Sequence, residues 1–307
     1  MIILIGNRLK KGDTIGLVSP ASAEKSEKIK EKIEVLKRLG FNVKEGKHIY
    51  DKWGYLAGTD VDRASDIMDM FSDKSVDMIL CTRGGYGSMR LLPLIDFNII
   101  KENPKIFAGF SDITTLLNNI YSRCHIVTFH SPMCTSTFDD FTLKSFLDTL
   151  TCGHIPFTIK NPENIPTQYF NGEYAAGTLI GGNLSLISSL LGTSYALNTE
   201  NKILFIEDVG EEPYKIDRML TQLTLSGDLQ KCSGFILGQF TNCKLPHYEQ
   251  SLTLTEVLQD RVLSLKKPTL VNFQSGHSYP RITLPIGSSV EVNFKKGEIH
   301  VLESVVK

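Results

Sequence analysis

Short apolar stretches alternate with amphipathic stretches through the first half of the chain. The apolar runs predict buried strands near 14–20, 41–45, 76–82, 105–110 and 126–130. The segments between them repeat an apolar position every three or four residues, as amphipathic helices do. One such segment begins at Ser22 and places Ile29, Ile33 and Leu36 on one face. Strands that alternate with helices in this way predict an α/β fold with a doubly wound parallel sheet.

The pattern changes after a helix predicted at 142–150. Residues 152–174 are rich in Pro, Asn, Gly and Thr and show no helical period. We therefore expect a first domain at 1–150, a linker at 151–172 and a second domain at 173–307. Helices are predicted there from Asn183 and from Pro213. Short strands are predicted at 202–207, 234–239, 269–273, 282–284, 289–294 and 298–302. The second domain should therefore be rich in strands.

Composition and charge narrow the range of functions. The 307 residues are 41% hydrophobic and 22% charged, with a formal net charge of -1. This is typical of a soluble globular protein and predicts binding neither to a nucleic acid polymer nor to a membrane. The apolar start reaches Asn7 and Arg8 too soon for a signal peptide, and no run is long enough to span a bilayer. Six scattered cysteines without a C-x-x-C pair indicate free thiols in a reducing compartment, so we expect a cytoplasmic protein.

Ser111 is a candidate nucleophile. It follows the strand predicted at 105–110 and precedes a helix, within the sequence Gly109-Phe110-Ser111-Asp112. A serine at such a turn presents its hydroxyl at the carboxyl edge of a sheet, beside the amides of a helix N-terminus. The match to the G-x-S-x-G elbow is incomplete, and by the local pattern alone a serine that only caps the helix is the better interpretation.

A glycine-rich turn, Arg83-Gly84-Gly85-Tyr86-Gly87, follows the strand at 76–82. It matches neither a dinucleotide-binding motif nor a P-loop. It is either an ordinary tight turn or an oxyanion site built from consecutive amides. Ligands of doubly wound sheets bind beyond the carboxyl ends of the strands, where this turn and Ser111 both fall.

A serine nucleophile also needs a base and a carboxylate that orients the base. His277 is the most suggestive histidine because it lies in a loop between Gly276 and Pro280, although His125 and His130 flank a strand near Ser111. Glu207 and Asp208 both end an apolar strand and are carboxylate candidates. Asp112 fits better as a charge at a helix start.

Neither a metal site nor a cofactor site is predicted. The chain has no H-E-x-x-H motif and no cluster of His, Cys and Asp at ligand spacing.

Taken together, these motifs resemble the LD-carboxypeptidase family of serine peptidases, which includes murein tetrapeptide LD-carboxypeptidases and the microcin C self-immunity peptidases. The resemblance extends over both halves of the chain, and each motif contributes to it in the family's order. The matching segments are 12–21, 55–60 with Arg63-Ala64, 83–87, 109–114, 181–184, 205–211, Gly276-His277 and 283–287.

The resemblance implies roles for these residues. Ser111 would be the nucleophile, His277 the base and Glu207 the orienting carboxylate, and the amides of Gly85 and Asp112 would form the oxyanion hole. It also implies a flavodoxin-like N-terminal domain with a smaller β-rich C-terminal domain, a homodimer, and a murein-derived peptide as substrate. The expected reaction is hydrolysis of the L–D amide bond of murein tetrapeptide, which releases the terminal D-Ala during cell-wall recycling.

A carboxypeptidase must also bind a free carboxylate, for which a cation is suited. Arg83 and Arg218 are candidates, although salt bridges within the fold explain them equally well. Asn183 is a third substrate-binding candidate, but an N-cap role fits its position better.

Two alternative functions remain open at the level of sequence. The first is a self-immunity peptidase that cleaves microcin C-like peptide-nucleotide antibiotics. Members of that type tend to carry a longer insertion with an aromatic residue for the nucleobase, whereas this compact chain has its only tryptophan, Trp53, in the N-terminal half. The second is a catalytically silent ligand-binding module, which the intact set of Ser111, Glu207 and His277 argues against.

Overall fold

The structure is a computed structural model that describes residues 3–247 and 249–307. The chain forms two units, and a six-stranded sheet lies at the centre of the first. Its strand order is β12-β5-β4-β3-β1-β2. The strands are β1 (Thr14–Val18), β2 (Asn42–Glu45), β3 (Met78–Cys81), β4 (Ile106–Gly109), β5 (Thr128–His130) and β12 (Leu284–Ile286). Strands β1 to β5 are mutually parallel in the order 2-1-3-4-5, which is the flavodoxin-like arrangement. The predicted doubly wound sheet is thereby confirmed.

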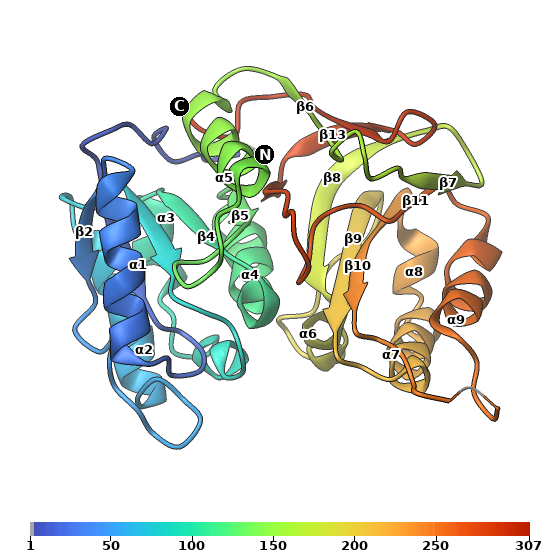
Figure 1. The fold of residues 1–307 in the computed structure, drawn as a ribbon, viewed down its shortest axis with the longest axis horizontal. Helices are drawn as coiled ribbons and strands as arrows, with labels where there is room; N and C mark the ends of the chain where they lie inside the picture. Colours follow the sequence, from blue (N-terminus) through green and yellow to red (C-terminus); the bar gives the residue numbers. More distant parts are fainter. Residues whose placement is uncertain (1–2, 248) are drawn as a thin grey trace. The chain divides into compact units, whose positions relative to one another are not determined.

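Five α-helices connect or flank these strands. They are α1 (Ser26–Arg38), α2 (Asp60–Ser72), α3 (Phe97–Glu102), α4 (Thr114–Cys124) and α5 (Asp140–Leu147). Helix α1 lies in front of the strands in Figure 1, whereas α2 contacts α3 and α3 contacts α4 as a separate series. Two short 3-10 helices, η1 (Ser88–Leu91) and η2 (Ser111–Ile113), and a short π-helix, η3 (Asp148–Cys152), are also present. As predicted, α1 buries Ile29, Ile33 and Leu36.

The second unit is built on an eight-stranded mixed sheet with the order β6-β14-β13-β8-β9-β10-β11-β7. Its strands are β6 (Phe157–Lys160), β7 (Gln168–Phe170), β8 (Tyr174–Asn183), β9 (Lys202–Val209), β10 (Gly234–Thr241), β11 (Thr269–Val271), β13 (Ser289–Asn293) and β14 (Glu298–Val301). Its helices are α6 (Leu184–Ser189), α7 (Pro213–Leu225), α8 (Asp228–Lys231) and α9 (Leu254–Arg261), with a short turn η4 (Leu263–Leu265). Strands β8 to β11 run parallel, so they share one carboxyl edge. The predicted strand-rich second domain is confirmed.

The segment predicted as a linker at 151–172 has a different structure. It contains β6 and β7, which form the two edges of the second sheet. Edge strands with exposed side chains carry little apolar signal: all three residues of β7 are exposed, and β6 buries only Ile159. The composition of this segment therefore did not predict its two strands.

A second difference concerns the C-terminal part of the chain. The strand predicted at 282–284 is β12, at Leu284–Ile286, and it pairs with β5 of the first sheet. Residues 283–287 and 304–307 therefore belong to the first unit, although the sequence placed all of 173–307 in the second. An apolar run indicates a strand but does not indicate which sheet receives it.

No helix within the described residues combines the length and the apolar character that crossing a membrane requires.

Candidate active site

Ser111 occupies a strained turn at the carboxyl end of β4. Its φ is 63°, in the left-handed region that few residues other than glycine adopt. A Cβ on Gly109, two residues earlier, would lie 2.9 Å from a methyl carbon of Ile113, so the turn needs a glycine there. The interpretation of Ser111 as a simple helix cap is not supported, because the N-cap residue of α4 is Ile113 and Ser111 is the first residue of η2.

The glycine turn after β3 lies directly against Ser111. A Cβ built on Gly84 would lie 3.0 Å from the Ser111 Cβ, 3.1 Å from its Oγ and 3.4 Å from the Asp112 amide nitrogen. Gly85 has a φ of +117°, which a residue with a side chain would adopt only under strain. The predicted meeting of the glycine turn and the serine at one sheet edge is therefore present within the first unit.

Asp112 fixes the glycine turn through its carboxylate. Its Oδ2 accepts a hydrogen bond from the Ser88 amide at 2.8 Å, and the Ser88 hydroxyl donates to the Asp112 carbonyl. The side chain is 1% exposed, and this burial raises the pKa of Asp112, an effect that the hydrogen bonds from Ser88 oppose. Asp112 is thus more than the helix-start charge that the sequence suggested.

Arg63 is a second support of the turn that the sequence did not single out. This buried guanidinium donates to the carbonyl of Gly87 at 3.0 Å and to that of Pro20, and it pairs with Asp60. Arg63 therefore joins the loop after β1 to the loop after β3. In the sequence, Arg63 could have been noticed from its place beside Ala64 in one of the segments that carry the family resemblance.

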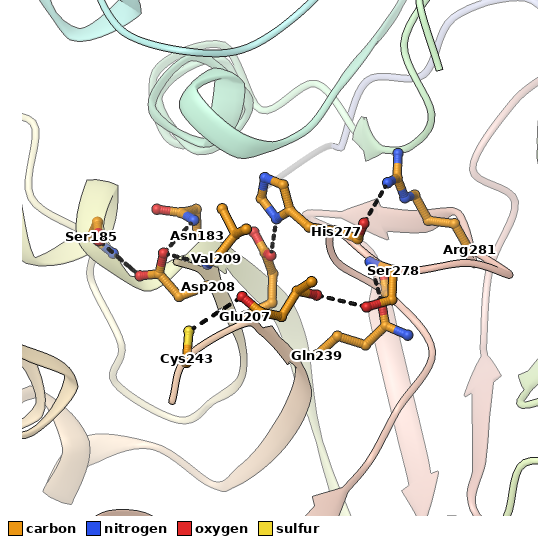
Figure 2. Close-up of polar contacts among 12 residues, drawn as sticks. Asn183, Ser185, Glu207, Asp208, Val209, Gln239, Cys243, His277, Ser278 and Arg281 are labelled. Carbon is orange, nitrogen blue, oxygen red and sulfur yellow. Dashed lines mark hydrogen bonds and ion pairs between the residues drawn. The ribbon is translucent and has the colours of Figure 1, made fainter. Parts of the chain in front are cut away.

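His277 and Glu207 form a hydrogen-bonded pair in the second unit. The His277 Nδ1 lies 2.7 Å from Glu207 Oε2, and the Glu207 side chain is fully buried in β9 (Figure 2). Burial raises the pKa of Glu207, while the bond to His277 and its positive charge when protonated act in the opposite direction. Gly276 has a φ of +143°, and a Cβ there would come within 3.1 Å of Glu207 Oε2. The glycine allows the histidine loop to approach the carboxylate.

Two residues that the sequence did not predict hold the histidine loop. Gln239 accepts a hydrogen bond from the Ser278 amide at 2.9 Å, and Arg281 donates to the His277 carbonyl at 3.2 Å (Figure 2). The Arg281 guanidinium also lies 4.5 Å from the centre of the Tyr279 ring. These contacts fix the backbone of the loop that carries His277.

Asp208 and Asn183 belong to the N-terminus of α6. Asn183 is the N-cap: its Oδ1 accepts from the Leu186 amide at 3.3 Å and its Nδ2 donates to Asp208. Asp208 also accepts from the amide and hydroxyl of Ser185, at 2.9 and 2.8 Å. The structure therefore pairs Glu207, and not Asp208, with the histidine, and it confirms the capping interpretation of Asn183.

The two arginine candidates differ in their surroundings. Arg83 donates to the carbonyls of Gly84 and Ala23 and lies 3.6 Å from Glu24, so its guanidinium is engaged within its own unit. Arg218 is exposed on α7, with its guanidinium 5.3 Å from the centre of the Tyr214 ring.

The competing histidines have other positions. His125 ends α4 at the opposite end from Ser111, about 16 Å along the helix axis. His130 is fully buried in β5, with its ring edge-on to Phe110.

One trio of potential metal ligands occurs among residues 3–247 and 249–307. The ring nitrogens of His48 lie 2.8 Å from Asp51 and 3.8 Å from Asp62. Asp51 is exposed, and ordinary ion pairing accounts for the trio.

Fold and site together define a two-unit α/β protein. It carries a strand-end serine beside a glycine turn, and a half-buried histidine paired with a buried carboxylate. Two family models match it: the LD-carboxypeptidase N-terminal domain over residues 15–131 and the LD-carboxypeptidase C-terminal domain over residues 176–292. The chain belongs to the LD-carboxypeptidase family.

Individual relatives agree with this assignment. The chain is 41% identical over 290 residues to a protein of Bacillus subtilis named probable murein peptide carboxypeptidase, covering 93% of this chain and 90% of that protein. It is 30% identical over 334 residues to the microcin C7 self-immunity protein MccF of Escherichia coli, covering 98% and 96%.

Solved structures give the same result. A structure of MccF in complex with glutamyl sulfamoyl guanosine matches with a TM-score of 0.89 at 27% identity, over 99% of this chain and 100% of that one. A muramoyltetrapeptide carboxypeptidase from Oxalobacter formigenes matches with a TM-score of 0.84 at 29% identity, over 96% and 100%. These similarities support a carboxypeptidase activity.

Proposed function

We propose that the protein is a serine carboxypeptidase that hydrolyses the L–D amide bond of murein tetrapeptide and releases the terminal D-Ala. The observation that carries this proposal is the 2.7 Å pair between His277 Nδ1 and the buried carboxylate of Glu207. A carboxylate on Nδ1 fixes the tautomer in which Nε2 can accept a proton, and it stabilises the imidazolium that results.

The proposed reaction has two halves. Ser111 Oγ attacks the carbonyl carbon of the L-centred residue while His277 Nε2 takes the serine proton. His277 then gives this proton to the nitrogen of the D-Ala, the C–N bond breaks, and the peptide remains as an ester on Ser111. Water, deprotonated by His277, hydrolyses the ester and frees the serine. The proposal requires His277 Nε2 to reach hydrogen-bond distance of Ser111 Oγ.

The glycine turn would stabilise the oxyanion of both tetrahedral intermediates. The Gly85 and Asp112 amides are the proposed donors, since Gly84 brings the turn against Ser111 and the Asp112 carboxylate holds it. One such donor typically lowers the activation barrier by on the order of 3 kcal/mol. A turn that is fixed before the substrate arrives needs no reorganisation during the reaction.

The terminal carboxylate of the substrate requires a cation, and Arg218 is the better of the two candidates. Its guanidinium is exposed, whereas Arg83 already bonds two carbonyls and lies near Glu24.

The murein peptide is preferred over a peptide-nucleotide substrate for one reason. The match to MccF extends over 334 aligned positions, more than the 307 residues of this chain, so MccF has residues without counterparts here. The alignment with the murein peptide carboxypeptidase relative is shorter: it covers 93% of this chain within 290 positions.

Purified protein offered murein tetrapeptide tests the proposal, with free D-Ala as the readout. We expect the wild type to release one D-Ala for each tetrapeptide that it cleaves. The Ser111→Ala variant should release D-Ala at least about 10³-fold more slowly. Ser122→Ala, which removes an exposed hydroxyl on α4, is the control and should retain full activity. Turnover by Ser111→Ala at the wild-type rate would contradict the mechanism, and cleavage of an aminoacyl-sulfamoyl nucleoside without D-Ala release would contradict the substrate.

A further inference from the structure

Ser22, in the loop after β1, packs directly against the glycine turn of the first unit and has no part in the chemistry described above. A Cβ built on Gly85 would lie 2.3 Å from Ser22 Oγ, whereas a Cβ built on Gly84 would lie 3.1 Å from Ser111 Oγ. The two neighbouring glycines therefore contact different serines. Gly84 lies against the proposed nucleophile, and Gly85 lies against the half-buried Ser22.

Two hydrogen bonds join Ser22 to the backbone on either side of Gly85. The Ser22 amide donates to the Gly84 carbonyl at 3.4 Å, and the Ser22 Oγ accepts from the Tyr86 amide at 3.1 Å. Gly85 has a φ of +117° and no side chain that could restrict its backbone. Its conformation must therefore be selected by contacts of its neighbours, and Ser22 supplies one on each side.

The bond to the Gly84 carbonyl also sets the direction of the Gly85 amide. Both groups belong to one planar trans peptide unit, in which the C=O and the N–H point in opposite directions. A Gly84 carbonyl that is held toward the Ser22 amide therefore directs the Gly85 N–H away from it. This direction matters because an oxyanion donor is effective only when it is aimed at the position where negative charge develops.

The loop that carries Ser22 is itself held in place. The Pro20 carbonyl accepts a hydrogen bond from the buried guanidinium of Arg63. The Ala21 carbonyl accepts one from the Ala57 amide at 3.0 Å. Both residues that precede Ser22 are thus bonded to the rest of the first unit. A group that aims another group needs a fixed support of this kind.

We infer that Ser22 is a positioning residue of the oxyanion hole, which fixes the direction of the Gly85 amide before the substrate arrives. This inference rests on the proposed function, in which that amide is an oxyanion donor. Ser22 acts through the backbone of the turn and needs no contact with the substrate. The oxyanion develops only on the way to the tetrahedral intermediate, so a misdirected donor weakens binding of the transition state and leaves binding of the substrate unchanged.

The Ser22→Ala variant tests this role, because it removes the acceptor of the Tyr86 amide. We expect kcat for D-Ala release to fall about tenfold with KM within about twofold of the wild-type value. The matched control is Ser65→Ala: Ser65 is also half-buried, and its hydroxyl donates to the Asp62 carbonyl at 2.9 Å. Each variant loses one hydrogen bond between side chain and backbone, so their unfolding free energies should fall by similar amounts. Only Ser22→Ala should lose activity; an equal loss in both variants, or a change in KM alone, would overturn the inference.

The rate at which a fluorophosphonate modifies Ser111 supplies a readout that needs no murein substrate. The phosphoryl oxygen takes the place of the oxyanion in this reaction, so we expect the rate to fall about tenfold in Ser22→Ala and to stay unchanged in Ser65→Ala. This fall without D-Ala release by the wild type would support the role of Ser22 and contradict the proposed substrate. D-Ala release by the wild type with equal modification rates in the wild type and Ser22→Ala would overturn the role of Ser22 and leave the proposed function intact.

Discussion

At the scale of single residues, the site depends on groups placed where they are costly. Ser111 has a left-handed backbone, and the Glu207 carboxylate is buried without exposure to solvent. Strain and buried charge of this kind persist only where the surroundings over-determine them, and they concentrate at functional sites. The geometry around each group supplies that support: glycine neighbours at 84 and 109 for the serine, and His277 for the carboxylate.

Replacing Glu207 by Gln tests the role of the charge separately from that of the shape. An amide at this position would keep the packing but would not stabilise an imidazolium or enforce the same tautomer. We expect kcat to fall by about 10³-fold or more, with a smaller change in KM. Glu200→Gln, an exposed carboxylate just before the other end of β9, is the control. A Glu207→Gln enzyme within threefold of wild type would remove Glu207 from the mechanism.

The sequence could indicate candidate residues for the site but not the groups that hold them in place. Ser111, His277 and Glu207 stand at strand ends or in a loop, which residue patterns detect. Pattern alone could not choose between Glu207 and Asp208, because both end the same strand; the partners of α6 decide it. Arg63, Gln239 and Arg281 were missed because their functional contacts are with backbone groups distant in sequence.

At the scale of elements, the turns at strand ends set the geometry around Ser111. Gly84 has no left-handed φ but leaves little space for a Cβ beside Ser111, whereas Gly12 has a φ of +90° and open space. We expect Gly84→Ala to lower kcat about tenfold or more by displacing the serine. Gly12→Ala should leave kcat unchanged and cost about 1 kcal/mol of unfolding free energy through backbone strain. Steady-state kinetics and denaturant unfolding measure both, and normal turnover by Gly84→Ala would contradict the placement of the turn.

The junction of α2 and β4 contains a buried lysine with a testable pH dependence. Lys105 donates to the Met70 carbonyl at 2.9 Å and to that of Asp73, and it is 8% exposed. Burial lowers the pKa of Lys105 to about 8 from 10.5. Between these values the unfolded chain holds a proton that the folded chain has lost, so stability due to this group rises with pH.

The comparison with Lys105→Met isolates this contribution. From pH 7 to pH 10, the unfolding free energy of the wild type should rise relative to that of Lys105→Met by about 2 kcal/mol. Denaturant titrations at several pH values measure this difference. A difference that is constant or decreases with pH would contradict the assignment.

Element prediction succeeded where one face of an element is apolar and failed at exposed edges. The helix from Pro213 buries Ile216, Leu220 and Leu223 as predicted. Strands β6 and β7 were not predicted because an edge strand with exposed side chains lacks an apolar face. The return of β12 to the first sheet depends on its pairing with β5, which is a long-range choice that no local pattern encodes.

At the scale of the whole molecule, the proposed mechanism assigns complementary catalytic groups to the two units. The first holds Ser111 and the glycine turn, and the second holds His277 and Glu207. Neither part alone is a complete catalytic apparatus. The two family models match one segment in each half of the chain, residues 15–131 and 176–292.

The central claim is that Ser111 is a nucleophile activated by His277 from the other unit. The most direct measurement is reaction of the intact protein with a fluorophosphonate, followed by mass-spectrometric mapping of the modified residue. We predict a single adduct on Ser111 in the wild type and its loss in His277→Ala. An adduct on another residue, or Ser111 labelling at an unchanged rate in His277→Ala, would contradict the account.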